Sequence, residues 1–171
     1  MNVSRLVALV AAFASSLVLC SCANSSFQEV TPKGTDVTFE MPTPVKSSTE
    51  GQVQYFLSKA GKAEIRVSVF MRSSFPSQPG ASDVDVLRDF EEYYLSSLQE
   101  GWVQKGFNPQ INYEKELPGV HGFGQQIRAQ LGQQYSLLRF YISPTNLYQI
   151  KVDNGDESNP AVKRFFESIE I

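Results

Sequence analysis

The amino-acid sequence predicts an α+β fold, in which an antiparallel sheet of about six or seven strands packs against two main helices. Several segments alternate apolar and polar residues with the period of two that is typical of strands. Other segments repeat apolar residues at spacings of three and four, as amphipathic helices do. The connections are short, which favours antiparallel pairing of successive strands in the order β-β-β-α-β-β-β-β-α.

Alternation and turn residues mark the strands that precede the first helix. Val37 and Phe39 share one face of the first strand, and prolines end it a few residues later, because proline cannot donate a hydrogen bond within a sheet. Residues 53–57 and 65–69 alternate on either side of Gly61, which allows a turn. These two segments are expected to form a hairpin.

The first helix has a clear beginning and an apolar stripe. Ser82, followed three residues later by Asp85, is typical of a capping box, and Gly101 is a natural stop at the other end. The stripe that should pack on the sheet consists of Val84, Leu87, Phe90, Tyr94, Leu95 and Leu98.

Four more strands and a second helix complete the predicted domain. The strands are expected over residues 110–117, 122–131, 133–142 and 146–152. Asn159 as the cap and Pro160 at the first helical position begin the second helix. Its apolar face comprises Val162, Phe165, Phe166 and Ile169.

Residues 1–21 have the features of a secretory signal peptide. Arg5 supplies a positive charge, and residues 6–19 form an apolar stretch that is interrupted only by serines. This stretch of about 14 residues is shorter than the roughly 20 that a transmembrane helix needs. Residues 1–21 are therefore predicted to be cleaved from an exported protein.

The cysteines follow this leader directly, and Leu19-Cys20-Ser21-Cys22 resembles the lipobox of bacterial lipoproteins. The resemblance implies that Cys22 carries a thioether-linked diacylglyceryl group and becomes the first residue of the mature chain. Two or more acyl chains anchor a protein stably, whereas one binds a membrane only marginally. The alternative is a metal or redox pair of Cys20 and Cys22, but zinc wants four ligands and the chain has only these cysteines and one histidine.

Two regions are expected after the leader. Residues 22–34 form the lipidated start and a short tether, and residues 35–171 form a single α+β domain. The short tether would hold the domain close to the bilayer, on the periplasmic side of the cell envelope. Ala23, rather than aspartate, follows Cys22, and by resemblance to enteric lipoproteins this favours the outer membrane.

Most of the domain carries features that it shares with a known structural group. They are the hairpin, the helix from Ser82, the strand over 146–152, and the stretches 37–44 (Val-Thr-Phe-Glu-Met-Pro-Thr-Pro) and 164–171 (Arg-Phe-Phe-Glu-Ser-Ile-Glu-Ile). In these features the chain resembles the Mog1/PsbP-like α/β/α sandwiches. The resemblance implies a non-enzymatic role in binding or assembly, such as that of extrinsic subunits of photosynthetic complexes.

The charge of the chain disfavours nucleic acid as a partner. The mature part lacks Arg5 and so has 14 of the 15 basic residues and all 18 acidic ones, which gives it a net charge of −4. The basic residues are also scattered, whereas a nucleic-acid-binding protein normally gathers them on one face.

The residues that could suggest catalysis or a metal have simpler interpretations. His121 stands among glycines, which more often mark a turn, and no Gly-x-Ser-x-Gly motif is present. Residues 153–157 (Asp-Asn-Gly-Asp-Glu) lack the spacing of a calcium loop and fit a turn before a helix cap. Glu91 and Glu92 are adjacent and so point apart. The prediction is therefore no enzyme, no cofactor and no metal.

Three aromatic residues, Phe75, Trp102 and Phe107, form the candidate partner surface if they are exposed and clustered. The alternative is that they cover the edges of the sheet. The leading functional hypothesis is a lipid-anchored interaction protein that docks on a membrane protein complex or assists its assembly. A small-molecule or lipid-binding domain with a cleft between sheet and helix is the rival hypothesis, and an enzyme comes third.

Overall fold

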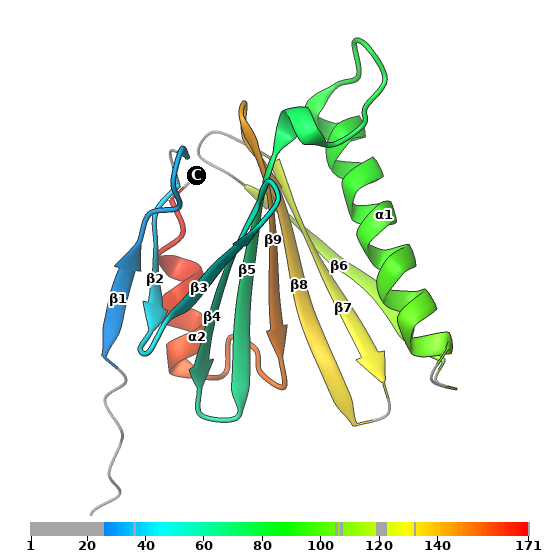
Figure 1. Cartoon of the computed structure of the whole chain (residues 1–171). Helices are drawn as coiled ribbons and strands as arrows, with labels where there is room; N and C mark the ends of the chain where they lie inside the picture. The colour runs from blue at the N-terminus through cyan, green and yellow to red at the C-terminus, as the bar shows by residue number, and fades with distance from the viewer. Residues whose placement is uncertain are drawn as a thin grey trace, which may run out of the picture.

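The computed structural model describes residues 26–35, 37–104, 106, 108–118, 123–131 and 133–170. Nine strands and two main helices follow one another along these residues (Figure 1). The helices are α1 (Asp83–Val103) and α2 (Pro160–Glu167), and a short 3₁₀ helix, η1, spans Arg72–Ser74. The strands are β1 (Phe27–Val30), β2 (Phe39–Pro42), β3 (Lys46–Glu50), β4 (Val53–Ala60), β5 (Ala63–Met71), β6 (Gln110–Pro118), β7 (Phe123–Leu131), β8 (Gln134–Ile142) and β9 (Asn146–Asp153).

Seven strands form one sheet in the order β3-β4-β5-β9-β8-β7-β6, and β1 pairs with β2 in a separate small sheet. All neighbouring strands run antiparallel. The pairing of β5 with β9 joins the two halves of the chain, with Val67 opposite Ile150. This architecture confirms the predicted α+β fold with two helices on an antiparallel sheet.

Two strands differ from the expectation. β1 belongs to residues 22–34, which the sequence assigned to a tether, yet it pairs along its whole length with β2. Only its last residue, Val30, is buried, so no period of two is visible. β3 is exposed at all five positions, so no alternation marks it either. In both cases backbone pairing, rather than a buried face, defines the strand.

The two faces of the main sheet bury separate cores, because neighbouring side chains of a strand point to opposite faces. On β8, Leu137 faces the core beneath α2, whereas Leu138 faces the core beneath α1. The core beneath α2 includes the small sheet, from which Phe39 packs edge-on against Phe165 of α2. The core beneath α1 centres on Phe90, which is 2% exposed.

α1 begins as the sequence predicted and ends later. Ser82 Oγ accepts a hydrogen bond from the backbone N–H of Asp85, and the Asp85 carboxylate accepts one from the N–H of Ser82, which makes a capping box. Gly101 does not stop the helix, because Trp102 packs on the core and extends the apolar stripe. Val84 was expected in this stripe but is 39% exposed.

α2 agrees with the prediction at its start and along its buried face. Asn159 caps the first turn with its side chain and Pro160 is the first helical residue. Val162, Phe165 and Phe166 are buried. Among the described residues, no helix is long and apolar enough to cross a membrane.

The two helices cover opposite halves of the sheet as well as opposite faces. α1 packs on β7 and β8, whereas α2 packs with β2 against β4, β5 and β9. Figure 1 shows α1 and α2 at opposite ends of the strand order. Two areas of the sheet therefore lack a helix: the α1 face of β3, β4 and β5, and the α2 face of β6 and β7.

Candidate functional site

A groove runs along the α1 face of the sheet, with β4, β5 and β9 as its floor and α1 as one wall. Two hollows make up this α1 groove, and the strand register shows that they adjoin. Arg66 of β5 lines one hollow, and Lys151, which lies opposite it on β9, lines the other. Tyr94 and Trp102, about two turns apart on one face of α1, line one hollow each. The α1 groove thus consists of two adjoining hollows on one face of the sheet.

The lysine end of the α1 groove is a hollow of about 590 Å³ where β4 turns into β5. Lys59 comes from the end of β4, Lys62 from the turn, and Lys151 from β9, and Trp102 lines the same hollow. Gly61 has a φ of 65°, in the left-handed region that favours glycine. This glycine makes the tight turn that places both Lys59 and Lys62 at the hollow.

The charges at the lysine end do not cancel. Lys151 Nζ lies 2.9 Å from the Asp153 carboxylate. Glu64 lies opposite Lys59 in the register, but its carboxylate is instead paired with Arg66 at 3.1 Å. Lys59 and the lysine of the turn are exposed and form no ion pair with any described residue. Two ammonium groups are therefore available to a ligand.

The other hollow, of about 440 Å³, contains a buried hydrogen-bond donor without an acceptor. Gln149 of β9 is 1% exposed and lines this hollow, and its Nε2 has no hydrogen-bond partner among the described residues. Such a buried polar group costs about 1–3 kcal/mol. Tyr94 lines the same hollow, and burial raises the pKa of its hydroxyl above the ordinary value of 10.0. We call this hollow the Gln149 end.

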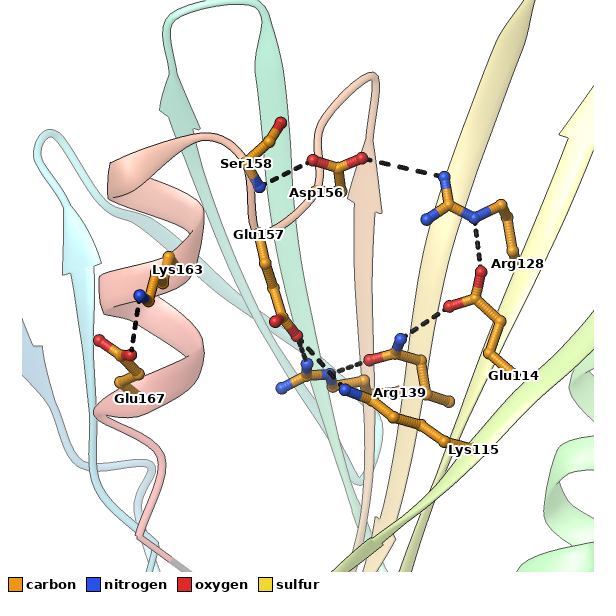
Figure 2. A network of polar contacts seen from close by, with 10 residues as sticks. Glu114, Lys115, Arg128, Arg139, Asp156, Glu157, Ser158, Lys163 and Glu167 are labelled. Carbon is orange, nitrogen blue, oxygen red and sulfur yellow. Dashed lines mark hydrogen bonds and ion pairs between the residues drawn. The ribbon is translucent and has the colours of Figure 1, made fainter.

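The opposite face of the sheet carries a polar network that the chain itself satisfies (Figure 2). Arg139 of β8 has a side chain that is only 7% exposed, and it donates to Gln126 and pairs with Glu157 in the loop before α2. Its guanidinium lies 3.6 Å from the ring centroid of Phe166 in α2. Lys115 of β6 also lies 3.8 Å from Glu157. Arg139 therefore ties β7, the loop and α2 together.

The same network continues across β6 and β7. Glu114, the bulged residue of β6, accepts hydrogen bonds from Gln126 at 2.7 Å and from Arg128 at 2.6 Å. Arg128 lies 3.9 Å from Asp156. Burial by itself would raise the pKa of Glu114, but the hydrogen bonds from Arg128 and Gln126 lower it below its ordinary value. The pKa of Asp156 is also lowered, chiefly by hydrogen bonds with Ser158.

The acidic run over residues 153–157 serves this packing. Asp153 pairs with a lysine, and Asp156 and Glu157 belong to the network. Gly155 passes so close to the β4–β5 hairpin that a Cβ there would lie 2.5 Å from the Cβ of Ala63. No group of three or more potential metal ligands occurs in the part of the chain that the structure describes.

The structure separates two members of the predicted partner surface. Phe75 is half-buried and packs against the start of α1 with an edge-on ring contact. Trp102 lies near the other end of α1 and lines the lysine end. The third member, Phe107, lies outside the described residues, as do Cys22 and His121.

Sequence reasoning missed Lys59, Lys62 and Gln149. In an alternating strand the polar residues are ordinarily assigned to solvent, so their position along one groove beside α1 does not show in the pattern. The available signal was that β5 and β9 are both polar at alternate positions. Antiparallel pairing of these two strands makes one polar strip of them.

Comparison with solved structures supports the predicted fold. No protein-family model matches the chain, and no curated protein matches it in sequence. Among similar solved structures is the solution structure of cyanobacterial PsbP (CyanoP) from Synechocystis sp. PCC 6803, with a TM-score of 0.57 and 12% identity. The match covers 86% of this chain and 93% of that one. The chain therefore has a PsbP-like fold, as the resemblance predicted.

Proposed function

We propose that this protein is an exported, lipid-anchored docking module that binds a membrane protein complex, or assists its assembly, through the α1 groove. The PsbP-like fold supports this proposal, since the group that the sequence resembles includes extrinsic subunits of photosynthetic complexes. The lipobox-like sequence that ends at Cys22 supports a position at a membrane.

The single observation that carries the proposal is a buried side-chain donor that lines the groove and has no acceptor among the described residues. Folded domains normally pair nearly all their buried polar groups, and a lasting exception calls for an explanation. Nε2 of Gln149 is one of three such exceptions among the described residues, with Ser58 Oγ and Glu91 Oε2, and the Gln149 side chain lines a groove that adjoins the unpaired lysines. An extended polypeptide brings a row of carbonyl acceptors, so it is a suitable occupant.

The path of the chain supports action close to a bilayer. In Figure 1 the chain enters β1 at the end of the molecule where β4 turns into β5, which is also the lysine end. From Cys22 to Ser26 an extended chain spans at most about 14 Å. An anchor on Cys22 would therefore hold the groove near the membrane and raise the local concentration of membrane-bound partners.

The rival hypothesis of a lipid-carrying cleft has less support. Lysines, carboxylates, tyrosines and three side-chain amides line much of the α1 groove. An acyl chain lying there would bury these polar groups without hydrogen bonds, at a cost of several kcal/mol. A bound lipid or other small molecule would show as extra mass in native mass spectrometry of the purified protein.

The test is cross-linked affinity purification of the tagged protein from its own cells. We compare the parent chain with Cys22→Ala and with the pair Lys59→Glu and Lys62→Glu. A charge-matched control pair, Lys33→Glu and Lys163→Glu, changes exposed lysines outside the groove.

The proposal predicts a small set of membrane-complex subunits with the parent and with the control pair. It predicts that these subunits decrease with Cys22→Ala and are lost with the groove pair. Equal recovery with the groove pair, or no specific protein with the parent, would contradict it.

A further inference from the structure

We infer that the α1 groove takes an extended acidic segment of the partner polypeptide. Carboxylates of this segment pair with Lys59 and Lys62, and one of its backbone carbonyls accepts a hydrogen bond from Nε2 of Gln149. The inference rests on the docking role proposed above and adds the chemistry of the occupant.

The dimensions of the groove suit an extended chain. Gln149 and Asp153 mark its two ends on β9, and four residues of strand span about 13 Å. On the wall, Tyr94 and Trp102 are eight residues apart, which is about 12 Å along a helix. A small anion would occupy one end, whereas about four extended residues reach both.

The unengaged groups at the lysine end and the buried amide of Gln149 are donors, whereas Glu50, the one carboxylate of the groove without an ion pair in the described part of the chain, is exposed at the Gln149 end. Among the described residues, the ammonium groups of Lys59 and Lys62 have no ion-pair partner. Nε2 of Gln149 likewise has no hydrogen-bond acceptor among them. The carboxylates beside them, Glu64 and Asp153, are already paired with Arg66 and Lys151. An occupant rich in acceptors and negative charge complements this set.

The lysine end differs in charge from its surroundings. The chain as a whole has a net charge of −3, which on average repels an acidic segment. The outward face of α1 is acidic and exposed, with Asp85, Asp89, Glu92 and Glu100. A basic segment would be drawn to that outward face, whereas an acidic segment would be drawn to the lysines of the groove.

Anionic lipid headgroups are the alternative source of negative charge, since the lysine end lies at the end of the molecule where the chain enters β1. Headgroups at the bilayer surface could meet Lys59 and Lys62. They would not also satisfy Gln149, which lies about 13 Å further along the groove. The position of the buried amide therefore favours a polypeptide.

The chain contains its own reporter for this test. Trp102 is the one tryptophan of the sequence and lines the lysine end, so its fluorescence senses an occupant. The full-length Cys22→Ala chain is titrated with a capped Gly-Glu repeat peptide of about eight residues, long enough to span the groove. A Gly-Gln peptide of equal length and vesicles rich in phosphatidylglycerol are titrated in parallel.

The expected result is a saturable change in emission with the Gly-Glu peptide and none with the Gly-Gln peptide. Replacing both lysines, Lys59→Gln with Lys62→Gln, should weaken binding about tenfold, since each exposed ion pair contributes up to about 1 kcal/mol. Gln149→Leu should weaken it about threefold or more through loss of the donor. The control Lys163→Gln on α2 should bind as the parent does.

Three results would overturn the inference: no saturation with the Gly-Glu peptide, an equal response to the Gly-Gln peptide, or unchanged binding after replacement of both lysines. Vesicles that saturate the response while the peptide does not would assign the site to a membrane surface instead. If the peptide fails but cross-linked partners still depend on the groove, docking stands and the acidic chemistry is wrong. If the peptide binds but no partner is recovered, docking through the groove fails.

Discussion

The two sheet areas that no helix covers are both polar, but they differ in how their polar groups are satisfied. On the α2 face, Arg139, Glu157 and Glu114 form a network in which carboxylates and guanidinium groups find each other within the chain. On the α1 face, Gln149 keeps a buried amide without an acceptor. The network thus satisfies its polar groups within the chain, whereas Nε2 of Gln149 has no acceptor among the described residues.

This difference shows that residue types alone do not separate structure from function. Lysines, arginines, glutamines and carboxylates line both areas. The distinction lies in whether each buried donor or carboxylate meets its counterpart. The comparison predicts opposite responses to substitution: loss of stability in the network, and loss of binding with little or no loss of stability in the groove.

The largest effect is expected from Arg139→Ala. It removes a nearly buried guanidinium that bonds Gln126, pairs with Glu157 and lies on Phe166. Loss of one partner of such a pair should lower the free energy of unfolding by about 2–4 kcal/mol. Urea denaturation measures this value. Arg139→Met, which keeps the apolar packing, should lose less, and a loss below about 1 kcal/mol for Arg139→Ala would show that the network is not structural.

The network should also make the protein sensitive to acid. The folded pKa of Glu114 lies below its ordinary value of 4.5, so its stabilisation is present above about pH 4.5 and is lost as the pH falls through the lower folded pKa. Glu114→Gln should lower the free energy of unfolding at pH 7. It should also make the decrease of this free energy between about pH 5 and pH 3 shallower than in the parent. Urea midpoints across this range measure it, with Glu92→Gln to correct for loss of one negative charge. An unchanged profile would contradict the account.

Gln149→Leu should act in the opposite direction to the network substitutions. The change removes a buried donor that has no acceptor, so the free energy of unfolding should stay the same or rise by up to about 1 kcal/mol. Thermal unfolding would then show an equal or higher midpoint. A loss of more than about 1 kcal/mol would mean that the fold itself uses the amide.

The smallest effect on stability is expected from Lys59→Gln combined with Lys62→Gln. Both side chains are exposed and without an ion pair among the described residues, so unfolding should change by less than about 0.5 kcal/mol. Circular dichroism and urea midpoints verify this. If this double substitution unfolds the domain, a loss of partner binding in the variant could no longer be attributed to the groove.

Much of the fold was predictable because burial leaves a periodic trace. Asn159, Pro160 and an apolar face at helical spacing predict α2. In β8 and β9 the sequence alternates between more and less apolar residues along most of each strand. β1 and β3 were missed because they are held by backbone pairing and bury little. Gly101 was misjudged as a stop because only the packing of Trp102 shows that the helix continues.

The candidate site was far less predictable than the fold. In the sequence, Lys59 and Lys62 are indistinguishable from ordinary surface lysines, and Gln149 looks like a solvent-facing polar residue of an alternating strand. Their placement along one groove depends on the pairing of β5 with β9, which lie far apart in sequence, and on α1 covering only part of that face. Lipidation of Cys22 is a prediction from the sequence alone, since that residue lies outside the described part of the chain.

The most direct test of the docking role is photo-cross-linking in living cells. A photo-reactive amino acid replaces Leu57, which lines the Gln149 end, and in a second strain Lys163, which lies on α2. The account predicts a discrete adduct from position 57 that disappears when Lys59→Glu and Lys62→Glu are added, and no such adduct from position 163. Equal adducts from both positions, or an adduct from position 163 alone, would show that the α1 groove is not the docking surface.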